Sequence, residues 1–248
     1  MELETVSIFC ETVFVLKRCK EMRTYLLDCS ACSQAEGRRQ LLAQMAEKCD
    51  DSRLEKAGRI RTEEGKFVSL AAGMLLQKIH REYTHGKAME GTWTGTVREL
   101  LEELEAPCQI GYRIGEHGKP YFAKFPICFS LSHSGEYVFA AADHDEVGVD
   151  IQKKNPDTIM RVAERFFAQK ETEHSLCLAK PERMTYLYRL WTMKEAYGKL
   201  TGKGVAACLG TLVEELGEVC FDIVQAPEGY EISICRYIAG EEKRKGNE

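Results

Sequence analysis

The sequence predicts an α+β protein, because helical and strand patterns are mixed along the chain without strict alternation. Apolar residues recur at helical spacing over much of the first hundred residues, alternate with other residues near position 130, and return to helical spacing after position 157. The 248 residues, 44% hydrophobic and 29% charged, are enough to bury a sizeable core. The length alone fits one large domain or two small ones.

The elements of the first part of the chain follow from these patterns. Val, Ile, Phe and Thr are frequent before residue 17, which indicates strand, whereas Leu41, Leu42 and Met45 share one side of a helix. The expected elements are one strand or two short ones at 5–16 and helices at 34–48, about 69–83 and 96–105.

Near mid-chain the apolar period changes to two, which indicates strands. Residues 127–133 and 137–142 predict a hairpin around the turn Ser134-Gly135. A third strand is expected at 147–151, after another polar turn. Together these segments predict an antiparallel meander.

The last third of the chain returns to a helical pattern and then closes with strands. Gly202 and Gly204 are expected to end the last helix, because glycine favours the left-handed conformation found there. The expected elements are helices at about 158–178 and 182–200, strands at 220–224 and 230–237, and a disordered charged tail at 241–248.

Composition excludes several function classes. A formal net charge of −5 argues against a nucleic-acid partner bound by broad phosphate neutralisation, although a local basic site remains compatible with it. No stretch approaches the roughly 20 apolar residues that span a bilayer, and the apolar run Val13–Leu16 is too short for a signal peptide. We therefore expect a cytoplasmic protein without a membrane partner. The eleven cysteines are irregularly spaced, and the lone pair Cys29 and Cys32 is a weak metal or redox motif.

Three segments carry residues suited to chemistry, and the first runs from Gly118 to Gly135. Pro120 favours an extended chain or turn that displays Lys119, and both Lys119 and His133 are suitable donors to a phosphate. Ser132 and His133 do not form a nucleophile–base pair, because adjacent strand residues point to opposite faces. The alternative is a hairpin whose turn happens to be rich in Ser and Gly.

The second segment is the strand expected at 147–151. Strand alternation places Asp150 and Gln152 on one side, next to Gly148, which leaves room for a ligand. Their oxygens suit Mg²⁺, which typically binds one or two carboxylates together with substrate phosphates. The alternative is a solvent-facing Asp and Gln on an edge strand.

The third segment lies on the helix expected at 182–200. Trp191, Glu195 and Lys199 are spaced i, i+4 and i+8, so they share one helix face. The alternative is an ordinary surface pair of Glu and Lys, which contributes little to stability, with Trp191 packed beside it.

In this order, the segments resemble the surfactin-type 4'-phosphopantetheinyl transferases. The matching segments are Gly118-Lys119-Pro120, Leu131-Ser132-His133-Ser134-Gly135, Val147-Gly148-Val149-Asp150-Ile151, Trp191 to Lys199 and Gly202-Lys203-Gly204, with a weaker match from Ser69 to Leu76. The resemblance implies a pseudo-dimer of two similar α+β subdomains with the active site in the cleft between them. Residues 1–146 would form the nucleotide-holding subdomain and residues 147–240 the metal and catalytic subdomain.

The resemblance also implies the reaction. A 4'-phosphopantetheine arm would pass from coenzyme A to a serine of an apo acyl or peptidyl carrier protein, releasing 3',5'-ADP. Asp150 and Glu195 would hold Mg²⁺, with Gln152 at a position where many members have Glu. Glu195, directly or through water, would take the proton from the serine, and Lys199 would stabilise or protonate the departing 3',5'-ADP.

Nucleotide-binding residues are implied in the same way. Lys119, Ser132 and His133 resemble those that hold the nucleotide. The arginine usual before the segment at Ser69 is absent, so we expect Lys66, or the upstream basic group, to reach the 3'-phosphate. That group consists of Arg53, Lys56, Arg59 and Arg61. The alternative is a solvated helix face beside neighbouring glutamates.

The partners implied are coenzyme A and an acidic carrier protein, bound by a monomer. We expect the carrier to dock where basic residues surround apolar ones, namely Arg161, Arg165 and Lys170 around Val162, Phe166 and Phe167. The competing hypothesis is a weakened homologue that binds coenzyme A or a carrier protein without turnover. Gln152 and the missing arginine favour it, whereas Asp150, Glu195 and Lys199 favour the enzyme.

Overall fold

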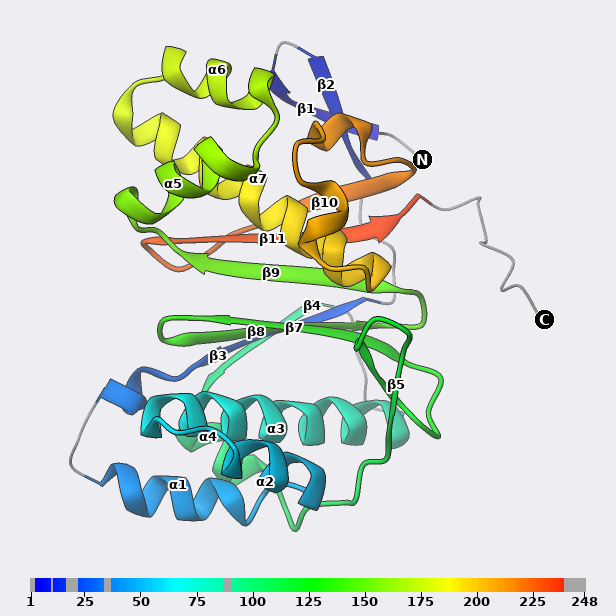
Figure 1. Ribbon diagram of the computed structural model, residues 1–248. Helices are drawn as coiled ribbons and strands as arrows, with labels where there is room; N and C mark the ends of the chain where they lie inside the picture. Colours follow the sequence, from blue (N-terminus) through cyan, green and yellow to red (C-terminus); the bar gives the residue numbers. More distant parts are fainter. Residues whose placement is uncertain (1–2, 10, 17–21, 34–36, 87–90, 239–248) are drawn as a thin grey trace.

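The computed structural model describes residues 3–9, 11–16, 22–33, 37–86 and 91–238. Two β-sheets pack against each other and helices cover their outer faces, giving four layers (Figure 1). The first sheet has the order β4 (Gly91–Thr96), β3 (Arg23–Asp28), β8 (Tyr137–Asp143) and β7 (Cys128–Ser134). The second has the order β10 (Val219–Val224), β11 (Tyr230–Tyr237) and β9 (Val147–Lys153).

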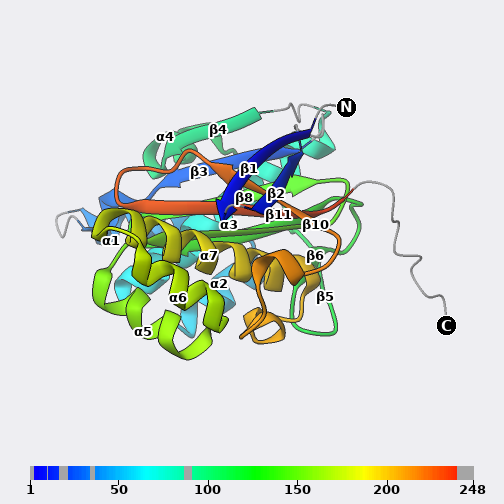
Figure 2. The same ribbon diagram turned by 90° about the horizontal axis from the view of Figure 1, so that it is seen from above.

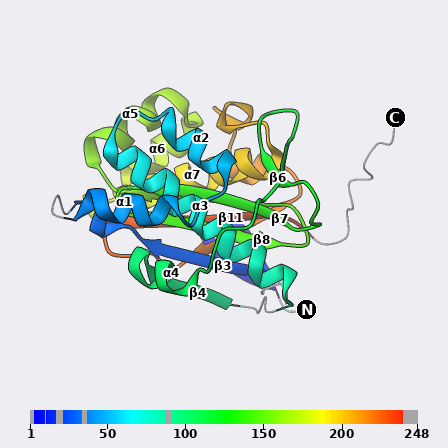
Figure 3. The same ribbon diagram turned by 90° about the horizontal axis from the view of Figure 1, so that it is seen from below.

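The molecule has two halves, each consisting of one sheet and the helices that cover its outer face. The first half contains α1 (Arg38–Ala46), α2 (Asp51–Gly58), α3 (Glu63–Thr84) and α4 (Val97–Glu103). The second contains α5 (Pro156–Phe166), α6 (Gln169–Cys177) and α7 (Lys180–Thr201). Figure 2 shows α5, α6 and α7 on the side of the second sheet, and Figure 3 shows α1, α2 and α3 on the opposite side. The predicted α+β class is confirmed, and the similarity of the two halves stays a prediction.

Two short antiparallel ribbons complete the fold. They are β1 (Leu3–Phe9) with β2 (Glu11–Leu16) and β5 (Tyr112–Ile114) with β6 (Pro120–Phe122). The first ribbon lies beside β10, so the start of the chain adjoins the second half, although the predicted boundary assigns it to the first (Figure 1). The boundary at residue 146 stays a prediction. No helix in the described part of the chain has the length and hydropathy needed to cross a membrane.

Each half has its own core, and a third core lies between the sheets. Helix α3 begins after Thr62, whose side chain accepts a hydrogen bond from Gly65 N at 3.2 Å, and it buries Phe67 and Met74 completely. Helix α7 ends at Gly202 in the left-handed conformation (φ 72°), as predicted. Between the sheets, β9 turns Val147, Val149 and Ile151 toward Phe139 of β8.

The predicted meander is wrong at its third strand. β9 pairs with β11, with Val149 opposite Ile234, and leaves the sheet of β7 and β8. Serine hydroxyls of β7 meet the free edge of β9 instead: Ser130 Oγ accepts from Val149 N at 3.1 Å and Ser134 Oγ from Lys153 N at 2.9 Å. Side-chain oxygens thus accept hydrogen bonds from backbone N–H groups of β9 that would pair with the main chain of a neighbouring strand in a continuous sheet.

Other boundaries differ from the predictions in instructive ways. The helix expected at 158–178 is broken between α5 and α6, because Phe167 and Ala168 adopt extended backbone. Helix α3 starts six residues earlier than expected, and the described part of the first expected helix is α1. Helix α2 and strands β3 and β4 were not predicted. Residues 34–36 and the tail at 241–248 lie outside the described residues.

Candidate active site

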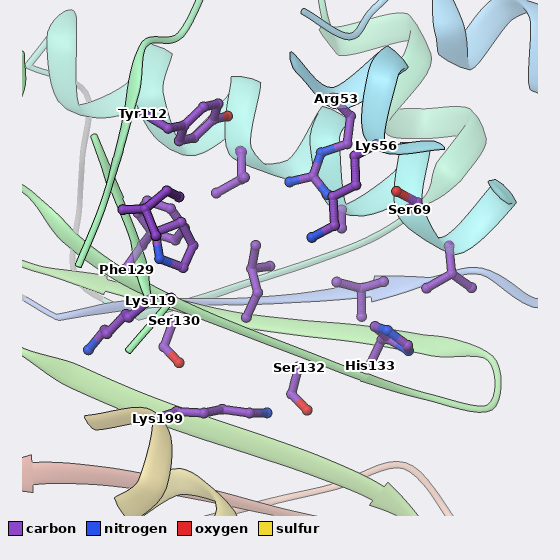
Figure 4. Close-up of a pocket in the computed structure, with 18 of the residues that line it drawn as sticks. Arg53, Lys56, Ser69, Tyr112, Lys119, Phe129, Ser130, Ser132, His133 and Lys199 are labelled. Carbon is purple, nitrogen blue, oxygen red and sulfur yellow. The ribbon is translucent and has the colours of Figure 1, made fainter. Parts of the chain in front are cut away.

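A cavity of about 1040 Å³ lies between the two halves. The first half contributes residues of α2, α3, the β5–β6 hairpin and β7, and the second half contributes the end of α7 and the turn after it. Figure 4 shows Arg53 and Lys56 on one side of this space, with Ser132, His133 and Lys199 on the other. The volume is sufficient for a ligand as large as a nucleotide with an attached arm.

Helix α2 supplies the basic side of the cavity. Asp50 caps the helix by accepting a hydrogen bond from Arg53 N at 2.9 Å, and Arg53, Lys56 and Arg59 follow at intervals of three residues. All three line the cavity. Burial, and then the charge of Arg53, lower the pKa of Lys56 from its ordinary value. Three cationic residues therefore share this side, and two of them, Arg53 and Lys56, repel each other.

Gly73 of α3 determines where Arg53 lies. A Cβ at this position would overlap Arg53 Cγ and lie only 2.9 Å from both Arg53 Cδ and Cys49 Sγ. Only glycine lets α2 pack this closely on α3 while the arginine side chain crosses between them. The glycine of the segment that begins at Ser69 thus positions a cavity-lining arginine.

Two further groups complete the first half's contribution. Ser69 lines the cavity, is buried, and has a hydroxyl without a hydrogen-bond partner in the described part of the molecule. His133 lines the cavity from β7, and its pKa is lowered by desolvation first and then by the charges of Lys199 and Lys56, which Asp150 opposes. The histidine and the two lysines thus act on one another across the same space, where an anion would relieve their repulsion.

Asp150 of β9 is the centre of the polar contacts. Its side chain is almost fully buried and accepts three hydrogen bonds. Oδ1 accepts from Ser132 Oγ at 2.6 Å and from Lys199 Nζ at 2.8 Å, and Oδ2 accepts from Gln152 Nε2 at 3.0 Å. Ser132 therefore orients Asp150, while His133 faces the cavity, as strand alternation predicts.

Gly148 explains how the second half brings its catalytic candidates together. A Cβ there would overlap Ala196 O and lie 2.5 Å from Leu200 N, so the space beside Gly148 is filled by α7. The expectation that this glycine leaves room for a ligand is wrong, because the helix backbone occupies that room. The close approach places Glu195 and Lys199 next to Asp150.

Glu195 is half-buried, and its carboxylate makes no hydrogen bond to any other described residue. Its pKa is raised, first by desolvation and then by the charge of Asp150, while Lys199 opposes the shift. The two carboxylates are therefore close enough to repel each other, which a divalent cation between them would reverse.

The donor set fits Mg²⁺. No group of three or more His, Cys, Asp and Glu side chains is arranged for a metal within the described ranges, but Mg²⁺ commonly uses only one or two carboxylates and completes its shell with water and substrate phosphates. Asp150 and Glu195 supply the carboxylates, and no donor from the described residues competes for the carboxylate of Glu195. Gln152 adds a carboxamide, whose Nε2 contacts Asp150.

The structure gathers most of the predicted site residues, but two lie differently. Arg53, Lys56, Ser132, His133 and Lys199 line the cavity. Asp150 contacts Ser132 and Lys199 of the lining, and Gln152 and Glu195 lie beside Asp150. Lys66 lies on α3 outside the cavity lining. Lys119 lines the cavity, but its ammonium group contacts the protein. Ser69 was missed, although it begins the weakly matching segment.

The predicted docking helix is only partly exposed. Phe167 is buried, and both Phe166 and Phe167 stack on Trp191 with ring centroids 6.3 Å apart. Arg165 lies over the Phe166 ring. Part of the apolar surface expected to meet a carrier therefore belongs to the core of the second half.

Comparison with known proteins identifies the family. A family model described as the 4'-phosphopantetheinyl transferase superfamily matches residues 146–232. A 4'-phosphopantetheinyl transferase of Bacillus subtilis is 37% identical over 190 residues, which cover 74% of this chain and 83% of the relative. The B. subtilis 4'-phosphopantetheinyl transferase ffp is 32% identical over 192 residues, covering 70% and 85%, respectively. The 4'-phosphopantetheinyl transferase Sfp of B. subtilis strain 168 is 29% identical over 171 residues, covering 63% and 75%. The chain therefore belongs to the 4'-phosphopantetheinyl transferase superfamily.

Proposed function

We propose that this protein transfers the 4'-phosphopantetheine moiety of coenzyme A to a serine of an apo acyl or peptidyl carrier protein, releasing 3',5'-ADP. The observation that carries the proposal is the arrangement of charges in one cavity. Lys56, His133 and Lys199 interact across it, and the carboxylate of Asp150, with Glu195 beside it, contacts Ser132 and Lys199 of the cavity lining. A bound polyphosphate would lie near these basic side chains and near the two carboxylates proposed to bind the metal.

Coenzyme A would be held mainly by the first half. Arg53 and Lys56 lie where they can neutralise the 3'-phosphate, and the guanidinium of Arg53 can bind it with two hydrogen bonds. The hydroxyl of Ser69 lacks a partner among the described residues and would gain one from a phosphate oxygen. His133 would approach the same anion from β7. Ser132 would act chiefly by orienting Asp150.

Asp150 and Glu195 would hold Mg²⁺, with Gln152 supplying a carboxamide oxygen or orienting Asp150. When bound, the ion would neutralise charge on the pyrophosphate under attack. Because Lys199 donates to Asp150 at 2.8 Å, its ammonium group compensates part of the charge of Asp150 before any metal binds. The lysine would turn to the phosphates once coenzyme A is present.

The chain's own residues account for the proton movements. Glu195, directly or through water, would accept the proton of the carrier serine as its oxygen forms a bond to the phosphorus of the phosphopantetheine arm. The bond from that phosphorus to the bridging oxygen breaks, and 3',5'-ADP leaves with the electron pair. Lys199 would stabilise or protonate this leaving group.

The carrier protein would dock on the second half near α5, where Arg161, Arg165 and Lys170 can attract an acidic surface. Both sides of the cavity come from one chain, so we propose that a monomer suffices. The cytoplasmic location expected from the sequence stays a prediction.

Mass spectrometry provides the test. The protein is incubated with coenzyme A, Mg²⁺ and several apo carrier proteins, and the expected result is a carrier heavier by one phosphopantetheine. Asp150→Ala and Glu195→Ala should each abolish the mass gain while keeping the wild-type circular dichroism spectrum. Glu102→Ala, which changes an exposed carboxylate on α4, is the matched control and should transfer normally. Coenzyme A binding without any mass gain would instead support the binding-module hypothesis.

A further inference from the structure

The ammonium group of Lys119 is fully engaged by the protein. Its side chain is only 9% exposed, although the residue borders the cavity. Nζ donates to Glu146 Oε2 at 2.7 Å, to Val147 O at 3.1 Å and to Leu200 O at 3.2 Å. A lysine ammonium group carries three hydrogens, so these contacts use all of its donors.

All three acceptors belong to segments at or beyond the junction between the halves. Glu146 lies in the turn before β9, Val147 starts β9, and Leu200 lies in the last turn of α7. Lys119 itself precedes β6 in the first half, where the hairpin turn is closed by a hydrogen bond from Gly115 N to Lys119 O at 2.8 Å. One side chain therefore joins the β5–β6 hairpin to two elements of the second half.

These contacts lie beside the cavity on both sides of the cleft. Gly118 and Pro120, the neighbours of Lys119, line it from the hairpin. Lys199 and Gly202 line it from the end of α7, and the Cβ direction of Gly202 points to Lys119 Cβ at 3.8 Å. Displacing the lysine would free the hairpin to move relative to Lys199.

We propose that Lys119 is a positioning residue that fastens the β5–β6 hairpin to the second half and thereby sets the width of the cleft. It acts on coenzyme A binding through the walls of the cavity and not as a phosphate ligand, because Glu146 already neutralises its charge. The inference rests on the proposed function for the choice of coenzyme A as the probe. The fastening itself does not depend on that function.

Glu146→Ala distinguishes a positioning role of Lys119 from phosphate binding, because the two roles predict opposite changes in the KM for coenzyme A. Glu146 does not line the cavity. If Lys119 fastens the halves, removing its partner loosens them and raises the KM for coenzyme A about threefold, while Lys119→Met raises it about tenfold. The kcat at saturating coenzyme A should stay within about threefold of wild type in both. If Lys119 instead binds a phosphate, Glu146→Ala frees its ammonium group and lowers this KM, which would overturn the proposal.

A double-mutant cycle in thermal unfolding tests the fastening without any activity. Lys119→Met should lower Tm by about 4 °C, Glu146→Ala by about 2 °C, and the double variant by no more than about 1 °C beyond Lys119→Met alone. Lys124→Met, an exposed lysine just after β6, is the matched control and should leave Tm and KM unchanged. Additive Tm losses would overturn the proposal. A wild-type protein that neither binds nor uses coenzyme A, but shows the non-additive cycle, would overturn the proposed function alone.

Discussion

The two sides of the cavity differ in how their charges are satisfied. On the second-half side, Asp150 accepts hydrogen bonds from Ser132, Gln152 and Lys199, so its charge is compensated within the protein. On the first-half side, the side chains of Arg53 and Lys56 make no hydrogen bond or ion pair with any described residue. The hydroxyl of Ser69 nearby also has no hydrogen-bond partner within the described ranges.

This difference shows where an anion would gain most from binding. A phosphate placed among Arg53, Lys56 and Ser69 would form contacts that the free protein lacks, without breaking existing ones. A metal near Asp150 would compete with Lys199, so its binding is expected to depend on phosphates that draw the lysine away. On the proposed function, the first half would supply most of the affinity for coenzyme A, and the second half would hold the reacting groups in place.

The largest expected effect comes from disturbing the close packing of the second half. Gly148→Ala would force a methyl group into Ala196 O and the backbone at Leu200, so α7 must move away from β9. We expect a loss of stability of about 3 kcal/mol or more and a fall of at least about 100-fold in transfer. Differential scanning fluorimetry and the mass-spectrometric assay measure these two quantities.

Gly111→Ala is the matched control for this glycine. Its new Cβ would meet Ala123 Cβ at 3.5 Å, an ordinary contact distance. Both stability and transfer should therefore stay close to wild type. A Gly148→Ala variant with normal transfer would show that Glu195 and Lys199 do not need the observed packing against β9.

Arg53→Ala tests the affinity assigned to the first half. Losing a charged, two-pronged contact to phosphate typically costs about 1.5–3 kcal/mol, so the KM for coenzyme A should rise about 10- to 100-fold with little change in kcat. The KM for dephospho-coenzyme A, which lacks the 3'-phosphate, should rise much less. Arg39→Ala, which removes a side chain 93% exposed on α1, should change neither value. An equal rise in KM with both nucleotides would show that Arg53 contacts a part of coenzyme A other than the 3'-phosphate.

Ser69→Ala should change stability and binding in opposite directions. The buried hydroxyl has no partner in the part of the chain that the structure describes, so removing it should leave Tm unchanged or raise it slightly. The affinity for coenzyme A should fall about three- to tenfold, because a phosphate oxygen loses a donor. Thermal unfolding and isothermal titration calorimetry report the two effects. A lower Tm with unchanged affinity would assign the hydroxyl a purely structural role.

Much of the second half could be predicted from local patterns. Strand alternation placed Asp150 and Gln152 together, and helical spacing placed Glu195 and Lys199 on one face of α7. Local patterns could not show that β9 leaves the meander, because its partner β11 lies about eighty residues further along the chain. The glycine at position 148 indicates that another group approaches the backbone closely there, but only the fold shows that this group is helix α7.

The first half was harder to predict. Helix α2 has eight residues and Ala57 is its only buried one, so it has no apolar stripe to reveal it. Its best local signal is Asp50, which caps the helix three residues before Arg53. The sequence predicts that Pro120 displays Lys119, but the lysine side chain is largely buried, because the acceptors that engage it come from elements distant in sequence. Side-chain partners of this kind are set by tertiary packing.

The smallest expected effect concerns the pH dependence of coenzyme A binding. The pKa of His133 in the free protein is lowered by desolvation, Lys199 and Lys56, with Asp150 opposing. A bound phosphate adds negative charge, so the pKa of His133 should be higher in the complex than in the free protein. Its contribution to affinity is then fully present below the free-protein pKa and is lost as pH rises through the pKa of the complex.

Comparison with His133→Gln isolates this contribution, because ionisation of the coenzyme A phosphate affects both proteins equally. Between pH 6 and pH 8, the affinity of wild type relative to His133→Gln should fall about two- to fourfold, as measured by calorimetry in matched buffers. His85→Gln, at the end of α3 and away from the cavity, should keep the wild-type profile. A relative affinity that stays constant or rises with pH would mean that His133 does not face the bound phosphate, leaving Arg53, Lys56 and Ser69 as its main contacts.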